Sequence, residues 1–129
     1  MMARTMQGGR RAGPREHGSA TAETAVVLPV LVMVLAAALW AITVVGAQLR
    51  CVDAARTGAR AAARGEALDA VRLEVLRAAP AGSRVVVDPG PEVTRVDVSV
   101  RVRPPWKSGF GSVEVTASAA SATESGVFQ

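Results

Sequence analysis

The stretch AVVLPVLVMVLAAALWAITVVGA, residues 25–47, decides the fold of this chain. Its 23 residues include no charged side chain, and Thr43 carries the only hydroxyl. A helix of 23 residues is about 34 Å long, which is enough to cross a bilayer core of about 30 Å. The stretch therefore predicts one membrane-spanning helix near the N-terminus. Pro29 has no backbone N–H, so we expect a modest kink close to the polar boundary.

The composition of the remaining chain predicts at most one small domain. The protein has 129 residues, of which 50% are apolar and only 3% aromatic. Because most apolar residues are Ala and Val, few large side chains are present to fill a core. Trp40 lies inside the apolar stretch, where we expect it to face another helix or lipid. Trp106 and Phe110 are expected to fold back onto the helix or the sheet edge.

The basic charge is concentrated ahead of the apolar stretch. The net charge is +4, and residues 1–18 contain four arginines against one acid, Glu16. Residues 19–129 are almost balanced and show no basic run interleaved with aromatic residues. That distribution differs from a nucleic-acid-binding surface, so we predict no nucleic-acid partner.

The residue types that support catalysis are scarce. His17 is the only histidine and Cys51 the only cysteine, and the sequence has no Gly-rich phosphate-binding loop. We therefore predict no enzyme activity, no catalytic or cofactor-binding residue, no metal site and no small-molecule substrate. Cys51 is interpreted as a small residue on a helix face, with an intermolecular disulfide as the alternative.

Residues 48–79 have the pattern of a helix. Arg56, Arg60 and Arg64 form a basic stripe, interpreted as a solvated face. Gly65 indicates a bend. The expected buried faces combine a stripe of mostly small residues with a more typical core stripe: Leu49, Val52, Ala55, Ala59 and Ala62, then Leu68, Val71, Val75 and Leu76.

The last third of the chain has the pattern of an antiparallel sheet. Residues 84–87 predict a first strand, and 88–91 predict a turn with Gly90 free to adopt positive φ. Val96, Val98 and Val100 alternate with polar residues, which predicts a second strand with one buried face. A third strand is expected around residues 113–117, and residues 118–129 are expected to form a mobile tail. The predicted fold class is α+β, with a long N-terminal helix whose C-terminal half packs against a three-stranded antiparallel sheet.

A short motif precedes the apolar stretch. The basic residues end at Gly18, and four small residues, Ser19 to Ala22, separate it from Glu23. This arrangement resembles the prepilin-peptidase site of type IV pilin-like proteins. Residues 18–66, through AETAVVLPVLVMVLAAAL and DAARTGARAAARGE, resemble the TadE-like minor pilins (pseudopilins) of tight-adherence pilus systems. Thr24 follows Glu23, where major Flp pilins have Tyr, and this favours a minor-pilin role.

The resemblance implies roles for four residues. Gly18 and Ser19 would flank the peptidase cut, so that residues 1–18 form a leader and Glu23 becomes the fifth residue of the mature chain. The Glu23 carboxylate would then neutralise the new α-ammonium group of a neighbouring subunit. Pro29 would belong to the same assembly segment. The implied partners are the membrane, other pilin subunits, the assembly machinery and the prepilin peptidase.

The predicted organisation is a leader (1–18), a membrane helix (19–47) and an extracytoplasmic helix-plus-sheet domain (48–129). The predicted location is the cytoplasmic membrane or a cell-surface filament. Lys and Arg near the two ends of the span do not settle its orientation. Two alternatives stay open. One is an uncleaved, membrane-tethered interaction module. The other is a domain released by signal-peptidase cleavage after Ala47.

Overall fold

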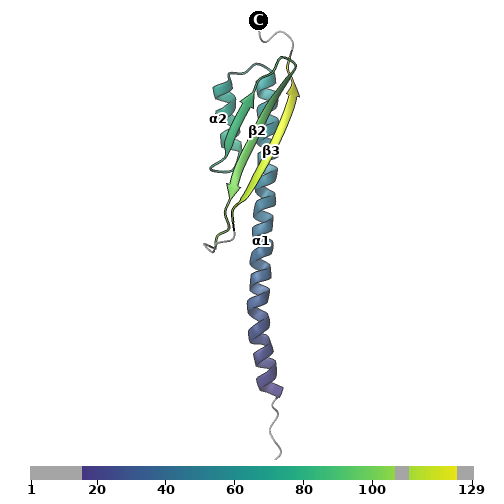
Figure 1. Cartoon of the computed structure of the whole chain (residues 1–129), viewed down its shortest axis with the longest axis vertical. Helices are drawn as coiled ribbons and strands as arrows, with labels where there is room; N and C mark the ends of the chain where they lie inside the picture. Colours follow the sequence, from purple (N-terminus) through teal and green to yellow (C-terminus); the bar gives the residue numbers. More distant parts are fainter. Residues whose placement is uncertain (1–15, 107–110, 125–129) are drawn as a thin grey trace, which may run out of the picture. The chain divides into compact units, whose positions relative to one another are not determined.

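The computed structural model describes residues 16–106 and 111–124. Its elements are α1 (Glu16–Ala63), α2 (Leu68–Ala78), β1 (Arg84–Asp88), β2 (Val93–Val102) and β3 (Val113–Ala122), as Figure 1 shows. The fold is α+β, as the sequence predicts. The chain divides into two compact units, at residues 1–37 and 38–129, and the division falls within α1.

In the first unit, α1 is an apolar helix that exposes its side chains. The large hydrophobic residues from Val26 to Leu35 are 51–71% exposed. The Thr24 hydroxyl donates a hydrogen bond to the carbonyl oxygen of Ala20 at 2.9 Å, which satisfies a donor that lipid could not solvate. By length and composition, α1 has one segment able to cross a membrane, and none of its most apolar window is buried.

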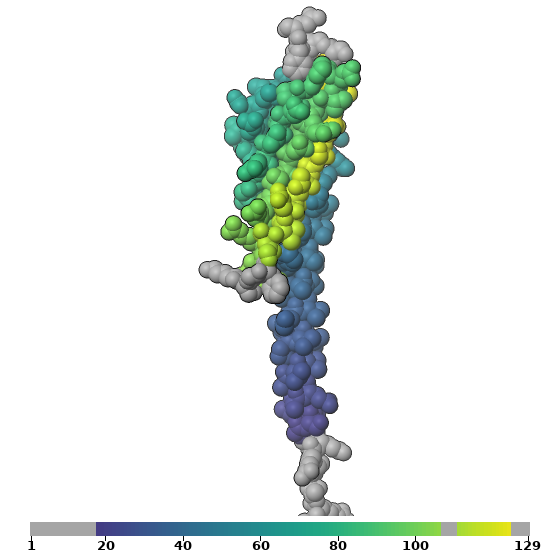
Figure 2. Space-filling view, in the orientation of Figure 1, coloured from purple at the N-terminus to yellow at the C-terminus, as the bar shows by residue number. Residues whose placement is uncertain are grey.

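The second unit, residues 38–129, contains an antiparallel sheet in the order β1-β2-β3. β2 pairs with β3 along its whole length, from Val93 opposite Ala122 to Val102 opposite Val113. β1 is shorter and pairs only with residues 95–99 of β2. In Figure 2 the green and yellow strands lie side by side over the C-terminal part of α1.

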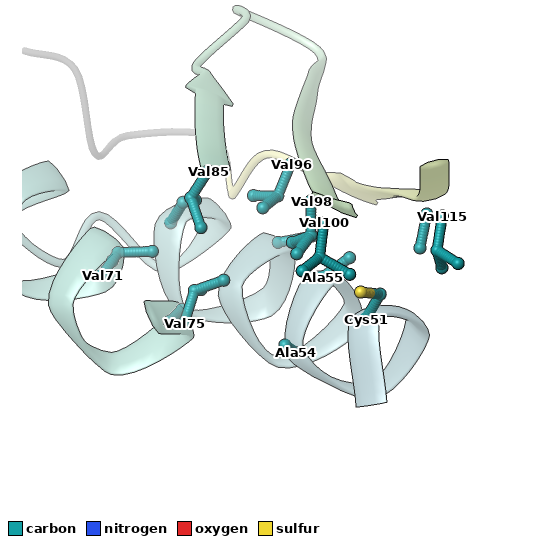
Figure 3. Close-up of a cluster of buried hydrophobic side chains, with 14 residues drawn as sticks. Cys51, Ala54, Ala55, Val71, Val75, Val85, Val96, Val98, Val100 and Val115 are labelled. Atoms are coloured by element: carbon teal, nitrogen blue, oxygen red, sulfur yellow. The ribbon is translucent and has the colours of Figure 1, made fainter. Parts of the chain in front are cut away.

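The core of this unit packs valines of the sheet against very small residues of α1. Val96 and Val98 of β2 are completely buried, as are Cys51 and Ala55 of α1 (Figure 3). Strand alternation sends the valines to one face. The helix contributes alanines and Gly58, and a Cβ at Gly58 would collide with Val75 of α2 and lie 3.5 Å from Val96. Small residues on α1 therefore compensate for the lack of large core side chains, because they let the backbones approach.

The helical region ends and restarts at Gly65. Its φ of 82° lies in the left-handed region that favours glycine, so the predicted bend is a complete break between α1 and α2. Val71 and Val75 are buried as predicted, but Leu68 and Leu76 are each 39% exposed. Leu49 is also exposed, and Cys51 and Ala54 occupy the buried face instead, because the face in contact with the sheet is rotated from the predicted stripe.

Two predictions about the sheet are wrong. The tail does not begin at Ser118, because β3 continues to Ala122 and Thr123 then donates its hydroxyl to the carbonyl oxygen of Gly90 at 2.8 Å. Gly90 does not adopt positive φ. Glycine is needed there because a Cβ would collide with the carbonyl oxygen of Val93. Residues 125–129 and Phe110 lie outside the described residues.

We expect Gly58→Ala to destabilise this unit by about 1–2 kcal/mol. Overpacking against Val75 costs about 1–3 kcal/mol, and better helix propensity offsets up to about 1 kcal/mol. Gly46→Ala is the control, because a Cβ there meets nothing within 4 Å, and it should gain about 0.5–1 kcal/mol. Denaturant unfolding of the full chain in detergent, followed by tryptophan fluorescence, measures the change in unfolding free energy of each variant. Equal effects of the two substitutions would contradict this packing.

Candidate functional site

The predicted processing site lies at the very start of α1. The helix begins at Glu16, so the bond between Gly18 and Ser19 is in its first turn. The first N–H groups of a helix have no intrahelical partner, and the terminal turn opens at low cost. Gly18 is exposed and a Cβ there would meet nothing within 4 Å. The bond is therefore accessible, and a peptidase could bind it after only the first turn unwinds.

Ser19 and Glu23 lie on the same side of α1. They line a shallow hollow of about 480 Å³ together with Ala22, Val26 and Val27. The spacing of four residues brings the two side chains to adjacent turns. Among the described residues, the recorded ion pair joins Arg64 and Glu66 at 2.7 Å, and none involves Glu23. The hollow thus combines an available carboxylate with an apolar surface.

Pro29 does not belong to this hollow. It is exposed inside α1, and the helix continues through it. Pro29 cannot donate a hydrogen bond to the carbonyl of Ala25, four residues earlier. The structure therefore brings together Ser19 and Glu23 on the exposed surface, places Gly18 beside them in the chain, and separates Pro29.

The two tryptophans of the chain meet in the second unit. The ring centroids of Trp40 in α1 and Trp106, which follows β2, are 6.1 Å apart with an interplanar angle of 56°. This geometry is within the favourable range for aromatic pairs. Trp40 therefore packs against Trp106 of its own domain, which differs from the predicted contact with another helix or lipid. Trp106 folds back onto the helix as predicted.

Cys51 lies in the core, and the arginine stripe lies on the surface. Cys51 lies four residues beyond the apolar stretch, is a free thiol, and is fully buried in the core. Burial raises the pKa of this thiol, which favours its protonated form. Arg56, Arg60 and Arg64 are exposed, which confirms the predicted solvated face.

A basic groove in the second unit could not be predicted from local sequence. Arg50 of α1 lines it together with Arg101 and Arg103, which lie at and just beyond the end of β2. The groove forms where β2 extends past β1, so its location depends on strand length and register. The signal in the sequence is a pair of arginines two positions apart, but alternation along a strand indicates only that both lie on its exposed face.

These observations define a class of protein: an α+β domain on a long, exposed apolar helix that suggests a single-pass membrane anchor. The model of the TadE-like protein family matches residues 18–60, which include Gly18, Ser19, Glu23 and Pro29. This match shows that residues 18–60 are similar to the TadE-like family, and it ends before α2 and the sheet. A search of curated proteins gave no match, and a search of solved structures gave none.

Proposed function

We propose that the chain is a TadE-type minor pilin, inserted in the membrane as a precursor and cut by a prepilin peptidase. It would then be assembled into, or prime, a tight-adherence pilus or a related secretion apparatus. The observation that carries the proposal is the shared hollow of Ser19 and Glu23 on an exposed apolar helix, within the segment that matches the TadE-like family. No catalytic reaction is assigned to the chain itself.

The proposed cut makes the ion pair possible. Hydrolysis of the bond between Gly18 and Ser19 consumes one water and yields a carboxylate on Gly18 and an ammonium on Ser19. It also removes all four leader arginines. A carboxylate near lipid is costly unless a partner neutralises it, and the ammonium of a neighbouring subunit supplies one. The Val26 and Val27 side chains beside Glu23 would exclude water from this contact.

The packing of the second unit disfavours cleavage after Ala47. Val44 and Ala47 are partly buried against the core, and Trp40 contacts Trp106. A domain beginning at Gln48 would lose all three contacts and expose the apolar side chains beneath them. The tethered chain is therefore the more stable form, which supports retention of the helix as an anchor. In the proposed function the domain lies on the extracytoplasmic side.

The mature N-terminus tests this proposal. We expect intact-mass and N-terminal analysis of the chain, extracted from membranes of cells that contain the peptidase, to find Ser19 as the first residue. A chain that retains residues 1–18 would instead support an uncleaved, membrane-tethered interaction module. A fragment that begins at Gln48 would support a released domain.

A further inference from the structure

We propose that the groove formed by Arg50, Arg101 and Arg103 binds the phosphate of an anionic phospholipid. The inference goes beyond the pilin proposal and rests only on its first part, the membrane anchor. The groove has a volume of about 540 Å³ and lies entirely within residues 42–103 of the second unit.

Both walls of the groove combine apolar residues with arginine. One wall is α1, which contributes Ile42, Thr43, Gly46 and Ala47 in addition to Arg50. Ile42 is 67% exposed, and the Thr43 hydroxyl already donates to the carbonyl oxygen of Leu39 at 3.0 Å. This wall therefore presents an apolar surface of the kind that an acyl chain would contact.

The opposite wall is the end of β2 and the residue after it, which contribute Val100 and Val102 as well as the exposed residues Arg101 and Arg103. None of the described residues that line the groove is an Asp or Glu. Glu114 faces Arg101 across the sheet and lines a neighbouring hollow that Arg101 and Arg103 also line, but no ion pair joins Glu114 to either arginine among the described residues. Guanidinium groups bind phosphate oxygens through paired N–H donors. The three arginines around this groove form no ion pair with any described residue, and this favours a phosphate ligand.

The position of the groove along the chain favours a lipid as the source of that phosphate. Residues 42–47 are the last six of the uncharged stretch, and Arg50 is among the first charges after it. The Trp40 and Trp106 rings meet at the same part of α1. Tryptophan and arginine are both favoured at the membrane–water interface, where arginine near an acidic leaflet contributes roughly fivefold in affinity.

The open edge of β2 does not favour a protein strand as the occupant. Residues 100–102 of β2 have no partner on the β1 side among the described residues. Three residues are too few for a stable added strand, whereas typical strands have about five or six. The groove beside this edge is instead closed by Pro80 and Ala81.

Bromolipid quenching tests the site, because the only two tryptophans of the chain, Trp40 and Trp106, are the reporters. The full chain is reconstituted in phosphatidylcholine vesicles that contain a small fraction of brominated phosphatidylglycerol. We expect quenching above that given by the same fraction of brominated phosphatidylcholine. Each single substitution to Gln in the groove should weaken the apparent affinity about fivefold, and Arg50→Gln/Arg101→Gln/Arg103→Gln should abolish the excess.

The control is Arg56→Gln/Arg60→Gln/Arg64→Gln, which removes the same charge from the exposed stripe and should keep the excess quenching. Equal quenching by the two brominated lipids, or equal loss in both triple variants, would overturn the site. Displacement by inorganic phosphate at matched concentration would show that the ligand is free phosphate, which overturns the lipid assignment. Vesicle flotation distinguishes failure of the membrane anchor from failure of the lipid site. A chain that does not float with vesicles would contradict the anchor, and a chain that floats without lipid preference would contradict only the site.

Discussion

Glu23→Gln should prevent incorporation of the processed chain into filaments and leave its membrane insertion intact. The substitution keeps the size of the side chain but removes the charge that the Ser19 ammonium of a neighbouring subunit needs. An ammonium left without its partner in an apolar contact is strongly destabilising, and we expect roughly a hundredfold less assembled protein. Filament fractions sheared from cells, compared with membrane fractions by immunoblot, give the measurement.

Two further variants define the origin of this effect. Glu23→Asp keeps the charge on a shorter side chain and should retain part of the assembly. Glu74→Gln removes an equivalent acid from the exposed surface of α2 and should assemble normally. Normal assembly of Glu23→Gln would remove the ion pair from the mechanism, and a loss of membrane insertion in that variant would show that the residue acts before assembly.

Gly18→Leu should block processing almost completely. The bond after Gly18 lies in the first turn of α1, and a protease must unwind that turn to bind the backbone. Leucine stabilises the helical turn relative to glycine and adds a side chain beside the scissile bond. A small displacement of the reacting bond costs about a hundredfold in rate, so the precursor should persist.

Intact-mass analysis distinguishes the two forms, because the precursor retains its 18 leader residues. Gly13→Leu is the matched control, since it adds the same side chain elsewhere in the leader and should be cut normally. Efficient cleavage of Gly18→Leu at the same bond would mean that Gly18 has no role in recognition. The Glu23 variants should still be processed, so the two predictions can fail independently.

The elements with strong periodic patterns could be predicted from the sequence. The uncharged run at residues 25–47 identified the central part of α1, and alternating valines identified β2. β3 was predicted too short because its second half contains only alanine and serine. Such small side chains give little contrast between buried and exposed positions.

The two proposed sites also differ in how far the sequence predicts them. Gly18, Ser19 and Glu23 are close in the chain, so one helical turn is enough to place them together. The lipid groove joins Arg50 to Arg101 and Arg103 through tertiary packing and through the difference in length between β1 and β2. No local pattern specifies that difference, so only the folded domain shows it.

The buried thiol of Cys51 is an internal probe of how often the sheet separates from α1. It is the only sulfhydryl in the sequence, and its side chain is covered on all sides by α1 and the sheet. A thiol reagent can react only while the sheet is separated from the helix, so the labelling rate reports the frequency of that separation. A native chain thus records, without any engineered probe, whether lipid, processing or assembly makes the domain more rigid.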